Sequence, residues 1–171
     1  LLMSTEIIKQ VFPETQKILS DLKPFNTVSG ENNNSLINHF DNKLKALGAD
    51  SFKTFDKEKK RVNLFATLNT KSGNDRKGII VSGHTDGVPA SKSWSTEPFK
   101  AKLKDQKVFG RGACDMKGFI GIALSLVPDM KLLRRPIHLA LSYDEEVGCR
   151  GAPAMIEQMV TDLPAPKAVI V

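Results

Sequence analysis

Three clusters of acidic and imidazole residues follow one another at equal intervals along the second half of this chain. They contain His84, Asp115 and Glu146, and each of these residues lies 31 positions from the next. Two clusters follow a strand-like stretch, and the middle one precedes a helix-like stretch. An interval of this length places the three side chains in separate β-α units instead of one local loop. The chain is therefore expected to form an α/β fold in which several strand ends meet.

Apolar runs predict where the sheet and its helices lie. Gly78–Gly83 is continuously apolar, which is typical of a buried central strand, so His84 follows the carboxyl end of that strand. Pro136–Ser142 predicts a second apolar strand, which leads to Asp144. Because open α/β sheets place ligands beyond the carboxyl ends of their strands, both ends are expected at one site. The other expected elements are helices at 5–23 (interrupted near Pro13), 35–47, 116–127 (opened by Asp115) and 151–160, and strands at 49–56, 62–69, 99–103, 107–109 and 168–171.

Composition and charge limit the class of protein. A chain of 171 residues with 40% hydrophobic residues buries one core, and its longest apolar stretches are far shorter than the ~20 residues of a membrane-spanning helix. The net charge of +6 comes from scattered basic residues, and the densest run, Lys57–Arg61, is expected to form a solvated hairpin turn. Nucleic-acid binding is weakly supported, and no membrane association is expected. Two cysteines are too few for a disulfide framework, so a cytoplasmic protein is expected.

The residue types in the three clusters suit a divalent metal such as zinc. His84 supplies a neutral imidazole, and Asp115 could bridge two metals with its two carboxylate oxygens. One of Glu145 and Glu146 could bind a metal while its neighbour removes a proton from a metal-bound water and delivers it to a leaving nitrogen. Asp86 is placed to accept the other imidazole N–H of His84 and fix the ligating tautomer. The pattern is typical of a metallohydrolase.

Each residue also has a simpler interpretation. Asp115 alone is as well explained as a helix N-cap, and the acids at 144–146 as solvated loop residues. Structural roles are favoured for His39, in a helix, and His138, in a strand. The two cysteines, Cys114 and Cys149, are favoured as small buried thiols and not as ligands. It is the joint occurrence of three clusters at expected strand ends that favours a metal site.

Four stretches of this sequence resemble the dinuclear zinc deacylases and exopeptidases. That family includes acetylornithine deacetylase, succinyl-diaminopimelate desuccinylase, aminoacylase and carboxypeptidase G. The similar stretches are Ser82–Pro89, Trp94 with Pro98-Phe99, Gly110–Gly118 and Asp144–Gly148. The runs that begin at Cys114 and Asp144 are most similar to the acetylornithine deacetylase group.

The resemblance implies a three-layer αβα catalytic domain with a mixed sheet and two Zn²⁺ ions, with Co²⁺ as an alternative metal. It implies that His84 binds one zinc, Asp115 bridges both and Glu146 binds the second. Glu145 would be the general acid/base and Asp86 would support His84. It also implies a cis peptide bond after Asp115. The implied reaction is hydrolysis of a small-molecule N-acyl amino acid, with N2-acetyl-L-ornithine in arginine biosynthesis as the leading substrate.

Members of this family are considerably longer than this chain. The resemblance therefore implies that residues 1–171 form only the N-terminal part of the catalytic domain, without the lid/dimerisation domain and the C-terminal catalytic segment. Two further metal ligands would lie in the absent parts, so we expect weak or partial zinc occupancy and no useful activity for this chain alone. The full-length protein is expected to be a homodimer. Another acyl specificity, or a noncatalytic metal-binding module, remains an alternative.

Overall fold

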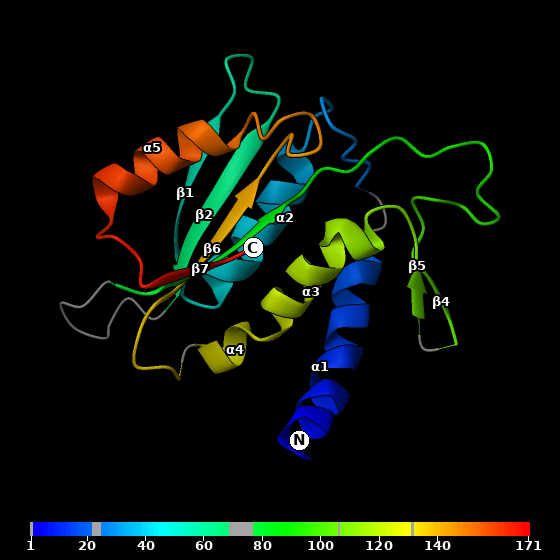
Figure 1. Cartoon of the computed structure of the whole chain (residues 1–171), viewed down its shortest axis with the longest axis horizontal. Helices are drawn as coiled ribbons and strands as arrows, with labels where there is room; N and C mark the ends of the chain where they lie inside the picture. Colours follow the sequence, from blue (N-terminus) through cyan, green and yellow to red (C-terminus); the bar gives the residue numbers. More distant parts are fainter. Residues whose placement is uncertain (1, 22–24, 69–76, 106, 131) are drawn as a thin grey trace.

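A computed structural model describes residues 2–21, 25–68, 77–105, 107–130 and 132–171 of the chain. A five-stranded mixed sheet forms its centre, with strand order β1-β2-β6-β3-β7 (Figure 1). A separate hairpin, β4-β5, extends away from the sheet. The strands are β1 Asp50–Phe55, β2 Val62–Leu68, β3 Ile79–His84, β4 Lys102–Lys104, β5 Lys107–Phe109, β6 Ile137–Ser142 and β7 Ala168–Ile170.

The pairing of the strands decides where the candidate residues come together. β1, β2 and β6 pair in antiparallel fashion, whereas β3 lies parallel to both β6 and β7. In the β3/β6 pair, His84 lies opposite Ser142, so both strands end at the same edge of the sheet. Every residue of β6 is buried, as the apolar run predicted. This register delivers the segment that begins at Tyr143 directly to His84.

Helices cover both faces of the sheet. On one face α1, α2 and α3 pack against β2 and β6 around a core that includes Phe40 and Leu64, both fully buried. On the other face Met155 of α5 packs with Phe65 and Ile80. The fold is therefore the predicted three-layer α/β arrangement with a mixed sheet. The helices are α1 Leu2–Asp21, α2 Asn34–Ala46, α3 Gly118–Ser125, α4 Val127–Met130 and α5 Ala152–Asp162.

Two helices differ from the prediction. α1 is one helix with Pro13 inside it, whereas the pattern left one bent helix and two short ones open, and the predicted end at Lys23 lies outside the described residues. The helix predicted for 116–127 begins later, at Gly118, and is divided into α3 and α4. Asp115 and Met116 have non-helical backbone angles within a wide turn at Ala113–Lys117. The prediction that Asp115 opens a helix was therefore wrong.

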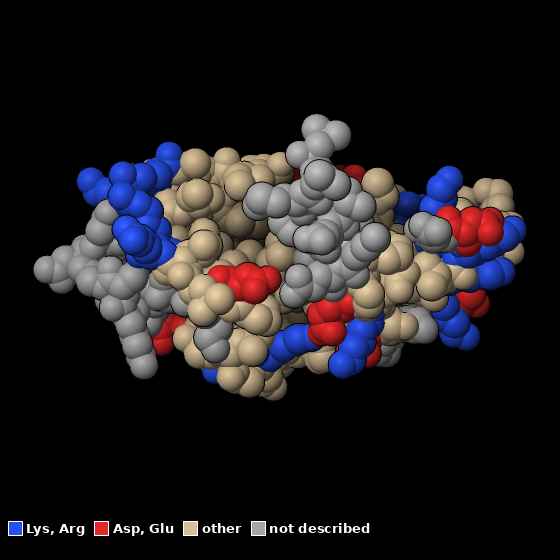
Figure 2. All heavy atoms as spheres, turned by 90° about the horizontal axis from the view of Figure 1, so that it is seen from below, with Lys and Arg blue, Asp and Glu red and all other residues tan. Residues whose placement is uncertain are grey.

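Basic side chains are scattered over the surface, as their positions in the sequence indicate. On the face in Figure 2, Lys and Arg side chains form separate groups with acidic side chains between them. The basic run Lys57–Arg61 lies in the turn between β1 and β2, as predicted. Within the described part of the chain, no helix is both long and apolar enough to cross a membrane.

Candidate active site

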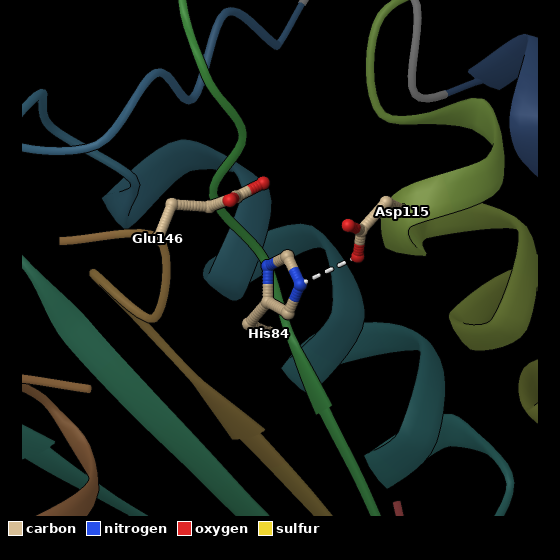
Figure 3. Close-up of side chains that lie close together, drawn as sticks. All are labelled: His84, Asp115 and Glu146. Atoms are coloured by element: carbon tan, nitrogen blue, oxygen red, sulfur yellow. Dashed lines mark hydrogen bonds and ion pairs between the residues drawn. The ribbon is translucent and has the colours of Figure 1, made fainter. Parts of the chain in front are cut away.

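Three side chains from three elements point toward one another at the edge where β3 ends (Figure 3). His84 is the last residue of β3, Asp115 lies in the turn before α3, and Glu146 follows β6. Each offers one ligand atom, and these atoms all lie within 4.8 Å of one another. Nε2 of His84 and Oδ1 of Asp115 are 2.9 Å apart. One imidazole and two carboxylates form a donor set that suits zinc, so the residues present fit such a metal.

The second nitrogen of His84 faces Asp86. Nδ1 lies 3.2 Å from the backbone oxygen of Asp86 and 3.4 Å from its carboxylate Oδ1. These contacts hold the imidazole ring so that Nε2 points to Asp115. Burial alone would lower the pKa of His84, but contacts with the carboxylates of Asp86 and Asp115 outweigh burial and raise it from 6.5 to about 9.

Asp86 also holds the loop that carries Glu145 and Glu146, here called the glutamate loop (residues 143–151). Its Oδ1 accepts the backbone N–H of Glu145 at 3.1 Å, and its Oδ2 accepts that of Glu146 at 3.3 Å. The hydroxyl of Ser29 donates to Oδ2 at 2.7 Å. Burial raises the pKa of Asp86, but these hydrogen bonds and His84 together hold it below its ordinary value. One buried carboxylate therefore connects the histidine with the glutamate loop.

The carboxylate of Glu145 lies beside the three ligand atoms, on the Nε2 side of His84. Its Oε2 lies 3.8 Å from Nε2 of His84, and 45% of its side chain is exposed. Its other oxygen, Oε1, lies 3.7 Å from Sγ of Cys149. A carboxylate that is open to solvent and adjacent to the donor set can accept a proton from a bound water and release it again.

The turn before α3 presents Asp115 outward. Its side chain is 72% exposed. The peptide bond between Asp115 and Met116 is cis, which agrees with the implication of the resemblance. At Gly118 a Cβ atom would lie 2.3 Å from the carbonyl oxygen of Ala113, so this position accepts only glycine without a shift of the turn. The turn, and not a helix N-cap, determines the direction of Asp115.

Lys117 lies buried behind this turn. Its ammonium donates to the carbonyl oxygen of Phe25 at 3.3 Å. Burial lowers the pKa of Lys117 to about 8, against the opposing effect of Asp86. No role was predicted for this residue from the sequence, because a single lysine between Met116 and Gly118 carries no local sign of burial.

The structure contradicts two predictions made for residues close to the site. Cys114 and Cys149 are both exposed and not buried thiols, because each lies in a turn at the edge of the sheet. Asp144 is only 1% exposed, which contradicts the alternative that the acids at 144–146 are all solvated. His39 lies in α2 and His138 in β6, where His138 stacks on Phe65.

Several residues that hold the site were not predicted from the sequence. Asn63 is fully buried, and its side chain accepts the N–H of Tyr143 and donates to the carbonyl of Gly151. It therefore closes the base of the glutamate loop. Asn33 is buried between Val62 and Thr85, with hydrogen bonds to both. These contacts join residues far apart in the sequence, so no local pattern marks them.

Solved structures share this fold. An M20 family metallo-carboxypeptidase from Sulfolobus solfataricus, Sso-CP2, has a TM-score of 0.76 and 24% sequence identity, over 92% of this chain and 36% of its own. Human carnosine dipeptidase 1 has a TM-score of 0.71 and 20% identity, over 92% of this chain and 38% of its own. At these identities the comparison concerns the fold. This chain therefore has the fold that these two peptidases share.

Sequence similarity then gives the family. Residues 80–171 match Peptidase family M20/M25/M40, and the chain belongs to this family. Acetylornithine deacetylase of Myxococcus xanthus is 34% identical over 153 residues, which cover 88% of this chain and 40% of that protein. Acetylornithine deacetylase of Pasteurella multocida is 34% identical over 134 residues, 74% of this chain and 33% of that protein. The chain thus spans about two fifths or less of the length of these relatives.

Proposed function

We propose that residues 1–171 are the N-terminal part of the catalytic domain of a zinc-dependent hydrolase of N-acyl amino acids. The observation that carries the proposal is the cluster of ligand atoms from His84, Asp115 and Glu146 within 4.8 Å, with the carboxylate of Glu145 beside it. The greater length of the curated relatives supports a lid/dimerisation domain and a C-terminal catalytic segment elsewhere in the full-length protein.

Each residue has a distinct task in this proposal. His84 and Glu146 would each hold one zinc, and Asp115 would contribute to both. When bound, zinc lowers the pKa of a bound water to about 7 and polarises the amide carbonyl. Asp86 keeps the Nδ1 of His84 occupied so that Nε2 is available as a ligand.

Glu145 moves the proton. Its carboxylate accepts a proton as the oxygen of water forms a bond to the amide carbon, and it delivers that proton to the amide nitrogen as the carbon–nitrogen bond breaks. The products are a carboxylic acid and an amine, which at neutral pH exist as a carboxylate and an ammonium ion. Its position 3.8 Å from the histidine ring and its partial exposure suit a group that exchanges protons with a substrate.

The leading substrate is N2-acetyl-L-ornithine, which would give L-ornithine and acetate in arginine biosynthesis in the cytoplasm. The support is the 34% identity to two curated acetylornithine deacetylases. Hydrolysis of N-succinyl-diaminopimelate or of another N-acyl amino acid or peptide is the alternative within the family. A noncatalytic metal-binding module is the alternative from another class, and the free carboxylate of Glu145 disfavours it because a structural site needs no such group.

The 171-residue chain supplies only part of the proposed site. Each zinc would keep Asp115 and one other ligand, whereas a catalytic zinc usually has three protein ligands. We therefore propose weak or partial occupancy by Zn²⁺ or Co²⁺ and no useful turnover for this chain alone. The homodimer expected for the full-length protein also remains a prediction.

Calorimetric titration with Zn²⁺ and an assay of acetylornithine hydrolysis, on this chain and on the full-length protein in parallel, test the proposal. We expect tight binding of two zinc ions and turnover only in the full-length protein. The alternative specificity would be supported if the protein hydrolysed succinyl-diaminopimelate, another acyl amino acid or a dipeptide faster than acetylornithine. Zinc binding without any hydrolysis would support the noncatalytic module, and tight binding of two zinc ions with turnover by the short chain would refute our proposal that the absent ligands are essential.

A further inference from the structure

One side chain of the basic turn between β1 and β2 reaches the glutamate loop. The guanidinium group of Arg61 donates through Nη1 to Oδ2 of Asp144 at 2.6 Å. Through Nε it donates to Oδ2 of Asp56 at 2.8 Å. The side chain of Asp144 is only 2% exposed, so this is a charge pair largely removed from solvent. Arg61 therefore contacts the residue that directly precedes Glu145.

Asp144 sets the direction in which the glutamate loop leaves β6. Its φ is +54°, a left-handed conformation that aspartate tolerates better than most residues. Its second oxygen, Oδ1, accepts the backbone N–H of Gly30 at 2.7 Å. The side chain is thus held on both oxygens, by Arg61 on one side and Gly30 on the other. Once this turn is fixed, the next two N–H groups, of Glu145 and Glu146, reach Asp86.

The loop is held at several points, and Arg61 supplies the charged contact among them. Asn63 holds its base at Tyr143 and Gly151, and Asp86 accepts the N–H groups of Glu145 and Glu146. A guanidinium group presents several N–H donors in a planar fork, so it can contact Asp56 and Asp144 at the same time. A lysine at the same position would keep the charge, but its donors all lie on one nitrogen and lack the planar fork of the guanidinium group.

We propose that Arg61 is a positioning residue that acts through Asp144 to fix the loop of Glu145 and Glu146. The catalytic consequence rests on the proposed function, whereas the effect on the loop does not. Among the described residues, the side chain of Arg61 pairs with Asp56 and Asp144 and lies over the ring of Tyr143, and it forms no hydrogen bond or ion pair with the ligand atoms or with Glu145. Its loss should therefore release the loop while leaving β6 and its neighbours paired.

Hydrogen exchange of the 171-residue chain tests the effect on the loop. In Arg61→Lys we expect the amides of 145–150 to exchange about tenfold faster, with those of β6 unchanged. Lys60→Met is the matched control, because Lys60 lies in the same turn and its side chain pairs with Glu58 at the surface. Its loop should exchange as in the unmodified chain. Equal loop protection in Arg61→Lys and the unmodified chain would overturn the proposal.

A double-mutant cycle tests whether Arg61 acts through Asp144. Asp144→Asn keeps an acceptor for Gly30 and a residue that tolerates the left-handed turn, but it loses the charge pair. We expect it to reproduce the faster loop exchange, and the double variant Arg61→Lys with Asp144→Asn to add little to either single change. Simple addition of the two effects would mean that Arg61 acts by another route, which contradicts the proposal.

Activity of the full-length protein tests the catalytic consequence. A displacement of about 1 Å at a reacting group can cost about 100-fold in rate, so we expect Arg61→Lys to lower kcat by about that factor. KM should stay within about twofold, and kcat is compared at saturating zinc because Glu146, a proposed ligand, lies in the same loop. An unchanged kcat in a protein that does hydrolyse the substrate would overturn this part. If the unmodified protein hydrolyses nothing, the proposed function fails, and the exchange result still decides the role of Arg61 in the loop.

Discussion

The raised pKa of His84 predicts a steep pH dependence of metal binding. A histidine must be neutral to bind a metal, whereas the metal-free His84 has a pKa of about 9 because Asp86 and Asp115 stabilise its charged form. At pH 7 the loss of that proton costs about 2.7 kcal/mol, at 1.36 kcal/mol for each pH unit below the pKa. Metal affinity should therefore rise with pH until the solution approaches pH 9.

The size of the effect distinguishes this site from an ordinary histidine. Between pH 7 and pH 8 the apparent Kd should fall about ninefold, whereas a histidine with a pKa of 6.5 would give a change of less than about 1.5-fold. Calorimetry of the full-length protein in two buffers with different protonation enthalpies measures both the Kd and the number of protons released. At pH 7 we expect His84 to release about one proton when the site binds its metal.

A second metal and a histidine in α2 provide the controls. Cd²⁺ is titrated beside Zn²⁺, because its bound water is less acidic and the released proton then comes from the protein. His39→Gln changes a histidine that lies in α2, away from the site, and should leave the pH dependence unchanged. An affinity that is flat between pH 7 and pH 8, with less than about half a proton released, would refute the argument that the carboxylates hold a charged His84.

Three further predictions concern single residues. Glu145→Gln should lower kcat of the full-length protein by about 10²–10⁴-fold without loss of zinc, because the proton carrier is removed and the ligands remain. Steady-state kinetics with metal analysis measures this. Normal turnover would exclude Glu145 as the acid/base. Ser29→Ala should lower the free energy of unfolding, measured by urea denaturation, by about 1.5–3 kcal/mol, since the charged Asp86 loses a hydrogen bond. Ser91→Ala is the control and should change the free energy little, because the hydroxyl of Ser91 contacts the exposed Ser93. Gly151→Ala should destabilise the chain by about 1–3 kcal/mol in thermal unfolding, because a Cβ atom would lie 2.6 Å from both Asn63 Oδ1 and the carbonyl oxygen of Tyr143; an unchanged Tm would show that the loop base can widen.

The sheet and the location of the site could be predicted because both depend on local patterns. A continuous apolar run predicts a buried strand wherever it occurs, so β3 and β6 were found almost to the residue. Parallel strands then bring their carboxyl ends to one edge, which placed His84 beside the acids after β6. The turn at Asp115 was not predicted correctly, because its apolar neighbours Phe119 and Ile120 also suit a helix that starts earlier.

The contacts that hold the site could not be predicted in the same way. The hydrogen bond from Ser29 to Asp86 spans 57 positions, and that from Arg61 to Asp144 spans 83. Pairing at such distances depends on the finished fold and leaves no periodicity in the sequence. Ser29 therefore looked like an ordinary loop residue, and Arg61 like one more charge in a solvated turn.

Several of the unpredicted contacts come from one segment, Thr27–Asn33, which leads into α2. It supplies none of the proposed ligand atoms, yet it contacts the segments that directly follow β3 and β6. Thr27 donates to the carbonyl of Thr85, Gly30 donates to Asp144, and Asn33 joins Thr85 to β2. The proposed metal site, with ligands at the end of β3, after β6 and before α3, thus depends for its shape on a segment that precedes all three elements. The residues that match the family begin only at position 80, so the chemistry lies within the matched region while part of the positioning lies outside it.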